Sequence, residues 1–509
     1  MRWTARFALL MIALGGTQAG AQDNPLKFAI RLSPEAAARP VSGRLLVMMT
    51  NAPAKTEDIR AGFGGIEGAA VYTAAMEVTN WIPGRQVTLN PDTLAYPAPF
   101  SQAPKGAWQA MALLDVDHSF ARSEEGPGDI KSAVLALQDV DPSKAGSISL
   151  TLTVVNPAES LQPPAGMKVA RLQSRILSAF MGRPVTMEAG IALPPSAARN
   201  PGRKYPVVLH VPGFGTPPAQ AMGLSPWTLQ MVYRRGANGS EPEMVHVFLD
   251  PNTPLGHAAF ANSVNNGPWG DALVREYIPY LEKRFPIIAS PRARFLTGHS
   301  SGGWSALWLQ VAYPDAFNGV WATGPDPVDF RAFCGVNLAS SPPENFYRKP
   351  DQTTRNLVRM SGRPVMSMQD FCRYEQVAGD YGGQMASFDA VFSPRGEDGR
   401  PMRLFDRQTG AVDPAVARAW VKYDISRLLT TNWPRLAPKL KGKLHVICGA
   451  EDNFHLNEAV ALLKETMRAL HSDAVVEIVP GRDHMNLYSG GLYDRIIREM
   501  AERNGVPRH

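Results

Sequence analysis

Residues 294–314 read RFLTGHSSGGWSALWLQVAYP, and this stretch decides the fold. Arg294 to Thr297 predicts a short strand, and residues 298–302 match the pattern G-x-S-x-G. In that pattern a strand turns sharply into a helix and holds a serine at the apex of the turn. Glycines flank the serine because a side chain would collide with the tight turn. Ser300 is therefore the candidate nucleophile.

The residues after the turn predict the helix that the pattern requires. Apolar side chains recur at i, i+3, i+4 and i+7 at Trp304, Leu307, Trp308 and Val311, which is one face of a helix. Pro314 marks its end. With 44 glycines in the chain the bare pattern also arises by chance, so its context carries the prediction. The alternative is a glycine-rich turn with an inert serine.

Strands and helices alternate on both sides of this turn. Further strands are expected at 207–211, 245–249, 320–323, 444–448 and 474–479, and helices at 272–285 and around 460–470. Such alternation indicates a mostly parallel sheet covered by helices on both faces, an α/β class fold. Residues 327–440 break the alternation, and we expect an insertion over the carboxyl edge of the sheet.

Other parts of the chain suggest a separate N-terminal domain and an export signal. Residues 22–165 read as short strands without long amphipathic helices, typical of a β-sandwich-like domain, and residues 166–509 form the catalytic domain. In residues 1–21 a basic start, an apolar run and Ala19-Gly20-Ala21 predict a secretory signal peptide cleaved after Ala21. The alternative is an uncleaved anchor. We expect a periplasmic or secreted protein.

Composition argues against several classes of protein. The formal charge of +6 falls to +4 once Arg2 and Arg6 leave with the signal peptide, and no dense basic run suggests nucleic acid. No later segment is apolar enough to cross a membrane. We find no Cys/His metal-ligand spacing and no dinucleotide fingerprint, so neither a metal nor a cofactor is expected.

The chain has three cysteines, of which two lie in the insertion. Cys448 lies in an apolar run and should pack as a small hydrophobe. Cys334 and Cys372 lie in the loop-rich insertion, and an oxidising compartment permits a disulfide between them. The alternative is two unpaired thiols, because sequence does not give the distance between them.

A serine nucleophile needs a base and an orienting carboxylate, which in this fold follow in the order Ser, Asp or Glu, His. His484 follows the 474–479 strand in a glycine-containing loop, so it is the candidate base. Asp452 follows the preceding strand and is chosen over Glu451, since one more residue carries it clear of the strand end. Asp326, after the 320–323 strand, is a third candidate for the acid.

Other residues complete the expected site. Backbone N–H groups of Ser301 and of Phe214, in the loop after the 207–211 strand, are the predicted oxyanion donors. The alternative for the second is an ordinary Gly/Pro turn. Trp269, Trp304 and Asp326 are candidate pocket residues, although core tryptophans and a solvated carboxylate are equally compatible with the sequence.

These motifs resemble the esterase family that includes esterase D, feruloyl esterases and mycolyltransferases. The resemblance rests on Lys204-Tyr205-Pro206-Val207-Val208 before a glycine loop, the helix 276–285, the Ser300 turn and the loops of Asp452 and His484. It spans about residues 170–326 and 440–500, and implies an α/β-hydrolase fold and ester chemistry. Pro212 stands where many members have a histidine, and the 327–440 insertion leaves substrate choice open.

The sequence thus favours an exported serine carboxylesterase that acts on a small-molecule or polysaccharide-linked ester through an acyl-enzyme on Ser300. A serine peptidase or an acyltransferase would use the same triad with another leaving group or acceptor. A catalytically silent carbohydrate-binding protein is the alternative from another class.

Overall fold

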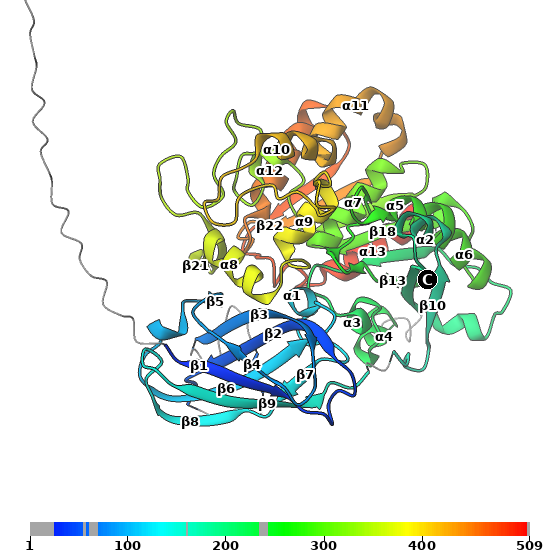
Figure 1. Cartoon of the computed structure of the whole chain (residues 1–509). Coiled ribbons are helices and arrows are strands. Elements are labelled where there is room, and N and C mark those ends of the chain that lie inside the picture. Colours follow the sequence, from blue (N-terminus) through cyan, green and yellow to red (C-terminus); the bar gives the residue numbers. More distant parts are fainter. Residues whose placement is uncertain (1–24, 54–57, 61–69, 159–160, 234–242, 506–509) are drawn as a thin grey trace, which may run out of the picture.

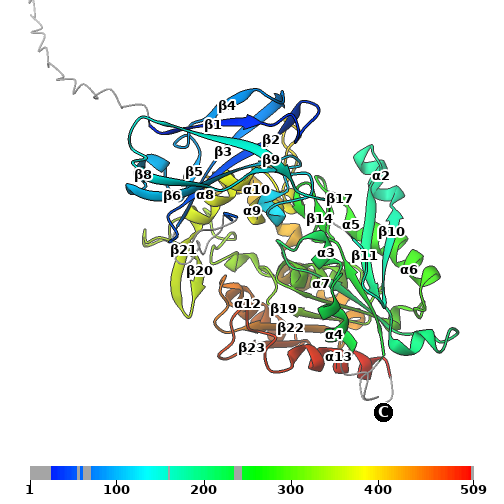
Figure 2. The same ribbon diagram turned by 90° about the horizontal axis from the view of Figure 1, so that it is seen from below.

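The computed structural model describes residues 25–53, 58–60, 70–158, 161–233 and 243–505. The predicted signal peptide, residues 1–21, lies outside these ranges. Two large sheets organise the described part of the chain, and they lie in separate bodies in Figures 1 and 2.

The larger body is built on an eight-stranded sheet in the order β10-β11-β13-β12-β18-β19-β22-β23. Its strands are β10 (Met167–Gln173), β11 (Thr186–Ala192), β12 (Val207–Val211), β13 (Val245–Leu249), β18 (Arg294–His299), β19 (Gly319–Thr323), β22 (Leu444–Gly449) and β23 (Val475–Val479). The pairs from β13 onward are parallel, whereas β11 pairs antiparallel with both β10 and β13. The predicted α/β fold with a mostly parallel sheet is confirmed.

Helices cover both faces of this sheet, because neighbouring residues of each strand point to opposite sides. On β12, Val207 and Leu209 belong to one hydrophobic core, with the helices α7 (Ser301–Ala312), α11 (Ile425–Leu440) and α12 (Leu456–Ala469). Val208 belongs to a second core, with α13 (Leu492–Arg503). Both faces of the sheet are therefore buried, which explains why its strands have continuous apolar sequences.

The helix expected at 272–285 is longer and less regular than predicted. It consists of α5 (Trp269–Ala272), one π-helical turn (Leu273–Tyr277) and α6 (Ile278–Arg284). Pro279 lies just after the π-helical turn, and its missing N–H removes one hydrogen bond of a regular helix at this point. Shorter helices flank the early strands: α2 (Arg175–Met181), α3 (Pro218–Ala221) and α4 (Pro226–Tyr233).

The smaller body holds one nine-stranded sheet in the order β4-β1-β9-β7-β6-β2-β3-β5, with β8 also paired to β6. Its strands are β1 (Lys27–Leu32), β2 (Val41–Thr50), β3 (Val71–Trp81), β4 (Gln86–Leu89), β5 (Ala95–Tyr96), β6 (Gly106–Asp115), β7 (Ile130–Ser132), β8 (Leu135–Val140) and β9 (Ser147–Val155). The predicted strand-rich character holds. All nine strands are linked by hydrogen bonds into one sheet, an order that strand periodicity alone does not determine.

The insertion at 327–440 contains more regular structure than its sequence suggested. It forms the hairpin β20 (Asn356–Met360) and β21 (Arg363–Ser367) and the helices α8 (Met368–Ala378), α9 (Gln384–Phe392), α10 (Pro414–Trp420) and α11. In both ribbon views α8 lies beside the blue N-terminal strands.

Helix α8 joins the two bodies. Val377 and Ala378 of α8 share a hydrophobic core with Leu46 and Met48 of β2. The buried Arg44 of β2 donates from Nε to the carbonyl oxygen of Val377 at 2.9 Å and from a second nitrogen to that of Gln376. These carbonyls lie in the last turn of the helix, where they lack helical partners, so Arg44 caps the C-terminal end of α8.

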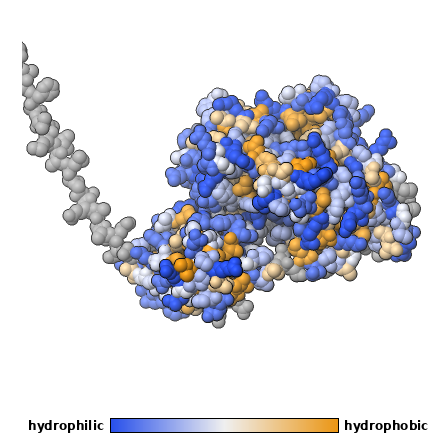
Figure 3. Space-filling view, turned by 45° about the vertical axis from the view of Figure 1, so that its right-hand side comes forward, coloured by the Kyte–Doolittle hydropathy of each residue, from blue (hydrophilic) through white to orange (hydrophobic). Residues whose placement is uncertain are grey.

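On the face shown in Figure 3, hydrophobic residues form scattered patches among hydrophilic ones. Within the described residues, no helix has the length and apolarity needed to cross a membrane.

Candidate active site

Ser300 lies between β18 and α7 in a backbone conformation that side chains rarely adopt. Its φ is 59° and its ψ is −126°. The turn is held from both sides, because Ser300 N–H donates to the carbonyl oxygen of Thr323 at 3.0 Å and Trp304 N–H donates to that of Ser300 at 3.0 Å. Such strain persists only where the surrounding structure imposes it, and it clusters at active sites.

The glycines of this turn are required by close backbone contacts. A Cβ on Gly298 would lie 2.2 Å from the carbonyl oxygen of Gly302, and one on Gly302 would lie 1.9 Å from that of Val211. Neither position accepts a side chain without moving backbone. The G-x-S-x-G pattern therefore reflects the packing of β18, α7 and β12 at one point.

His484 and Asp452 form a buried pair at the carboxyl ends of β23 and β22. His484 Nδ1 lies 2.8 Å from Asp452 Oδ2, and Asp452 Oδ1 accepts from the N–H groups of Phe454 and Leu456 at 2.9 and 3.2 Å. Burial alone would raise the pKa of Asp452, but the hydrogen bond and charge of His484 and the two backbone donors outweigh it and lower that pKa. Asp452 is thus an anion suited to orient the imidazole.

Aromatic side chains hold the ring of His484 in place. Phe454 meets it edge to face with ring centroids 5.0 Å apart, and His299 lies on it at 4.3 Å. Burial lowers the pKa of His299 to about 3, so this neighbour stays neutral and adds no positive charge beside the base. The backbone N–H of His484 donates to Asn453 Oδ1 at 3.0 Å.

Ser300, Asp326 and His484 line one cavity of about 760 Å³. The loop after β12 forms part of its wall with Gly213, Phe214 and Gly215. A Cβ on Gly213 would lie 3.3 Å from Ser300 Cβ, so this loop passes directly beside the serine. The structure thus brings the predicted Phe214 loop beside Ser300, and Ser301, the first residue of α7, follows Ser300 directly.

Asp326 is buried beneath the turn and contacts Ser301 instead of His484. Ser301 Oγ donates to Asp326 Oδ2 at 2.5 Å, and Gln384 Nε2 donates to the same oxygen at 3.3 Å. Burial raises the pKa of Asp326 to about 6 despite these donors. Glu451, the other alternative, is an exposed loop residue. Of the three carboxylates considered from the sequence, Asp452 is the one hydrogen-bonded to His484.

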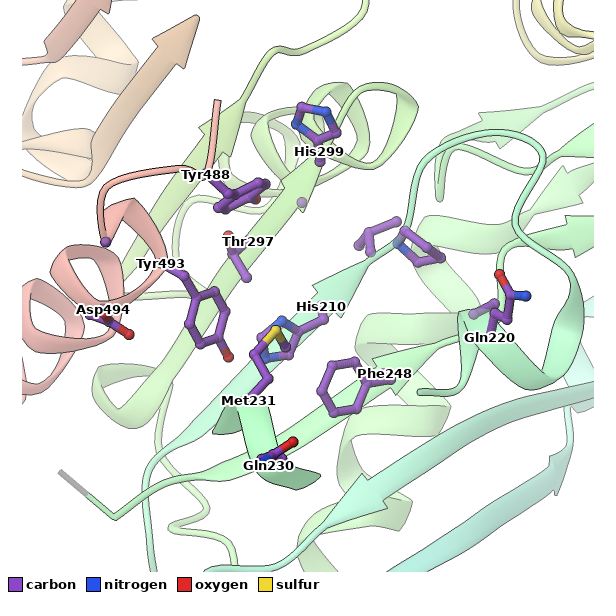
Figure 4. Close-up of a pocket in the computed structure, with 15 residues that line it drawn as sticks. His210, Gln220, Gln230, Met231, Phe248, Thr297, His299, Tyr488, Tyr493 and Asp494 are labelled. Atoms are coloured by element: carbon purple, nitrogen blue, oxygen red, sulfur yellow. The ribbon is translucent and has the colours of Figure 1, made fainter. Parts of the chain in front are cut away.

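A second cavity of about 550 Å³ lies beside the first and shares Gln220, His299 and Tyr488 with it. Figure 4 shows His210 and Phe248 together at its centre, with Tyr493 facing them from α13. His210 Nε2 lies 2.9 Å from His246 Nδ1, and burial lowers the pKa of both rings. Neither histidine lines the cavity of Ser300, so neither competes with His484 as a base.

Two predicted pocket residues lie elsewhere. Trp269 is 5% exposed, packs edge to face on Phe260 and donates from Nε1 to the carbonyl oxygen of Asn266 at 2.9 Å. Trp304 is 2% exposed and stacks on Trp308 behind the serine turn. Neither lines the cavity of Ser300: both are core side chains of helices next to the site, which is the alternative that the sequence left open.

The predicted disulfide is also absent. Cys334, Cys372 and Cys448 are all buried free thiols. Cys334 lines the cavity of Ser300, whereas Cys372 lies on α8, and burial raises the pKa of both thiols. Two cysteines in one insertion had suggested pairing, but proximity in the sequence does not bring the sulfurs to bonding distance.

Sequence reasoning missed the residues that shape most of the cavity. These come from α1 (Phe120–Ser123) and from the insertion: Phe120, Ala121, Arg122, Leu357, Phe371, Tyr374, Glu375, Gln384, Met385 and Phe388. Burial raises the pKa of Glu375 to about 7. No motif marks these positions. The only available signal was the placement of the insertion after β19, at the carboxyl edge of the sheet where ligands bind in α/β folds.

Part of the chain is similar to known proteins. Residues 178–332 match a family model described as "Putative esterase". The curated proteins give no match. Among solved structures, a ferulic acid esterase shares 16% identity over 67% of this chain and 99% of its own, with a TM-score of 0.43.

Two further solved structures are similar to this chain, with similarly low identities and TM-scores. An S-formylglutathione hydrolase from Agrobacterium tumefaciens shares 16% identity over 68% of this chain and 98% of its own, with a TM-score of 0.41. Dipeptidyl peptidase 4 of Porphyromonas gingivalis shares 12% identity over 85% of this chain and 46% of its own, with a TM-score of 0.37.

The sheet order, the serine turn and the family match together define an α/β-hydrolase. Within that superfamily, residues 178–332 match the esterase family, which supports a serine carboxylesterase.

Proposed function

We propose that this protein is an exported serine esterase in which Ser300, His484 and Asp452 form the catalytic triad. The observation that carries the proposal is the buried His484–Asp452 pair, 2.8 Å apart, which opens onto the same cavity as the strained Ser300. In this scheme His484 accepts the proton of Ser300 Oγ as that oxygen attacks the ester carbonyl. The alcohol leaves with the proton, and water then releases the acid from the acyl-enzyme.

Asp452 contributes through the imidazole and not through the substrate. Its Oδ2 accepts from Nδ1 of His484, which leaves Nε2 free to act as the base. Its negative charge stabilises the imidazolium that forms during attack. The N–H groups of Ser301 and Phe214 stabilise the oxyanion of the tetrahedral intermediate, and each such donor is worth about 3 kcal/mol in the transition state.

The cavity supports a small-molecule ester with a bulky apolar part. Its volume of about 760 Å³ falls in the range of sites that enclose whole drug-sized ligands. Phe371, Phe388 and Phe454 line it together with Leu357 and Met385. An aromatic or long acyl group would bury more surface here than an acetyl group, so we expect the bulkier ester to have the higher kcat/KM.

The organisation of the chain follows from the same proposal. Residues 22–165 form an N-terminal domain, which the sequence had suggested to be sandwich-like, and residues 166–509 form the catalytic domain with its insertion at 327–440. Residues 1–21 direct export and are removed. Intact mass measurement of protein from the periplasm or the medium should give a chain that begins at Gln22.

A fluorophosphonate probe tests the nucleophile directly, because only an activated serine reacts with it. Wild-type protein should carry the adduct on the peptide that contains Ser300, and Ser300→Ala should not label. Ser489→Ala removes an exposed hydroxyl five residues after His484 and serves as the control that labels fully. Labelling of Ser300→Ala at the wild-type rate would refute the assignment.

A substrate panel then separates esters from peptides. Matched aryl esters with acetyl, octanoyl and cinnamoyl groups should be cleaved with increasing kcat/KM, and dipeptide anilides should remain intact. Efficient anilide cleavage would show that the triad serves a peptidase, although the fluorophosphonate result would stand.

A further inference from the structure

Three aspartates gather beside the cavity wall, outside the catalytic site. Asp115 ends β6, Asp117 follows two residues later, and Asp129 precedes β7. One oxygen from each of the three carboxylates lies within 4.8 Å of the others. Asp115 and Asp129 are each 0% exposed, whereas Asp117 is exposed, so the cluster is buried on one side and reaches solvent on the other.

Backbone groups hold these carboxylates in place but do not neutralise them. Asp115 accepts from Ser119 and Phe120 N–H, each at 3.0 Å, and Asp129 Oδ2 accepts from Gly126 N–H at 2.7 Å.

The nearest basic side chains have other partners. His118 Nε2 lies 3.0 Å from Glu77, and Arg122 donates from Nη1 to the carbonyl oxygen of Thr253 at 2.6 Å. Within the described ranges, no Lys, Arg or His nitrogen forms an ion pair with the three aspartates. Arg122 and His118 act on the cluster only through longer-range electrostatics, so its carboxylates have no direct ion-pair partner among the described residues.

Ser119 supplies an independent observation. It is 3% exposed, and its Oγ has no hydrogen-bond partner among the described residues. A Cβ built on Gly126 would lie 2.8 Å from this Oγ, 3.7 Å from Asp129 Oδ2 and 3.9 Å from Asp117 Oδ1. The unpartnered hydroxyl and the two carboxylate oxygens thus surround a common space, which stays open because residue 126 is glycine.

We propose that Asp115, Asp117 and Asp129, together with Ser119 Oγ, bind a calcium ion. All the donors are hard oxygens, which Ca²⁺ and Mg²⁺ prefer, and no nitrogen or sulfur is present to favour a transition metal. Ca²⁺ accepts six to eight ligands in flexible geometry, whereas Mg²⁺ demands a near-ideal octahedron, and a loop of clustered carboxylates suits the former.

The aspartate cluster lies next to a segment that lines the cavity of Ser300, so a bound ion would affect the structure of that cavity. Phe120 N–H is bonded to Asp115, and Phe120 to Ser123 form α1, which lines the cavity of Ser300. Binding would fix the 115–129 loop and with it this wall of the cavity. The ion itself would take no part in ester cleavage.

Isothermal titration of the chelator-treated mature protein with CaCl₂ tests the proposal. We expect one saturable site with a Kd of about 10⁻⁴ to 10⁻³ M, as in extracellular calcium modules, and a Tm that rises with calcium concentration. Asp117→Asn should lose at least about tenfold in affinity, because it removes a ligand charge. The amide oxygen can still accept from Ser119 N–H, so the fold should be kept.

The matched control is Asp139→Asn, which removes an exposed carboxylate of the same sheet and should bind calcium like wild type. Should Asp117→Asn fail to fold, Ser119→Ala tests the same site, because it deletes a ligand without adding a group. No saturable binding and no shift in Tm up to about 10 mM calcium would overturn the proposal. Wild-type affinity in a folded Asp117→Asn would also overturn it, and equal affinity for Mg²⁺ would overturn the choice of calcium.

Discussion

At the residue scale, the roles of the carboxylates near Ser300 can be separated by single substitutions. Asp452→Asn keeps the size of the side chain but removes its charge and presents an N–H where His484 needs an acceptor. The wrong imidazole tautomer then forms, so kcat should fall by about 10³ to 10⁴-fold. Steady-state hydrolysis of an aryl ester measures this loss.

Glu451→Gln is the matched control for that substitution, because it changes the neighbouring carboxylate, which is exposed and outside the cavity. It should retain activity close to wild type, and Asp326→Asn should cost much less than Asp452→Asn. If Glu451→Gln or Asp326→Asn lost most of the activity while Asp452→Asn lost little, the residue changed in the inactive variant would be the acid of the triad.

The raised pKa of Asp326 predicts that the stability of the protein depends on pH. Burial raises its pKa from an ordinary 3.8 to about 6, so the folded protein binds this proton more tightly than the unfolded chain does. The stabilising contribution is complete below the ordinary pKa and is lost as the pH rises through about 6. Asp326→Asn removes the charge, so it should gain stability relative to wild type between pH 5 and about 8.

The measurement is the difference in Tm between Asp326→Asn and wild type across that range. Other buried acids contribute equally to both proteins and cancel in the difference. A difference that stays constant with pH would contradict a raised pKa for Asp326.

Individual site residues were predictable where a motif fixes both the residue and its place in the fold. Ser300, Asp452 and His484 each follow a strand of the parallel sheet, so their meeting at one edge followed from the alternation of elements. Trp269 and Trp304 have no such constraint. Aromatic residues next to a serine turn pack inward as readily as into a pocket, and only the packing of Trp304 on Trp308 decides between them.

At the element scale, the end of α8 should depend on a residue more than 300 positions earlier. Arg44→Met removes the donors to the carbonyl oxygens of Gln376 and Val377 and one of the two partners of Glu77. Hydrogen bonds from charged groups contribute about 1.5–3 kcal/mol, so urea unfolding should show a loss of about 2–3 kcal/mol. The KM for a bulky ester should rise as well, because Phe371 and Tyr374 of α8 line the cavity.

Lys105→Met is the comparison for this prediction. It breaks an ion pair with Asp139 in which both side chains are mostly exposed, and such pairs contribute little to stability. If both substitutions changed stability equally, Arg44 would not be the residue that secures α8.

The elements of the insertion escaped prediction for identifiable reasons. Helix α9 is buried on nearly all sides, so it shows no alternation of polar and apolar faces. Helix α11 contains Pro434 and Pro438, which suggest breaks in a sequence although the helix continues through them. By contrast, α12 carries a regular apolar stripe that includes Val460, Leu463 and Met467. Helix α7 is buried along almost its whole length, and the serine turn before it marked its start.

At the scale of the whole molecule, the N-terminal domain contributes to the wall of the cavity that holds Ser300. The α1 segment that follows β6 lines the catalytic cavity, and the core around Leu46 and Met48 includes Val377 and Ala378 of the insertion. A chain that begins at Gly166 should therefore expose apolar surface on α8 and lose one wall of its cavity. We expect poor solubility and little esterase activity from it, measured against the mature protein.

Supplying residues 22–165 as a separate chain is the informative control for this truncation. Recovery of activity would show that docking alone restores the wall. A soluble 166–509 fragment with wild-type kcat/KM would contradict the role given to the N-terminal sheet.

The arrangement of the N-terminal strands shows why whole-molecule features are hard to predict. The short strands expected in residues 22–165 are present, for example β4 (Gln86–Leu89) and β9 (Ser147–Val155). Yet β1 pairs with β9 in parallel and with β4 antiparallel, partners about 60 to 120 residues away. Pairing depends on contacts between distant segments, which no local pattern contains.

The backbone conformation of Ser300 lowers the stability of the fold. A serine at φ 59° and ψ −126° is held against its own backbone preference, at a cost of about 1–3 kcal/mol. Glycine tolerates that region, so the inactive Ser300→Gly should unfold at a higher denaturant concentration than the equally inactive Ser300→Ala, by about 1 kcal/mol. Reactivity and folding stability thus compete at a single residue. A more stable form of this protein, with glycine at position 300, would have no nucleophile.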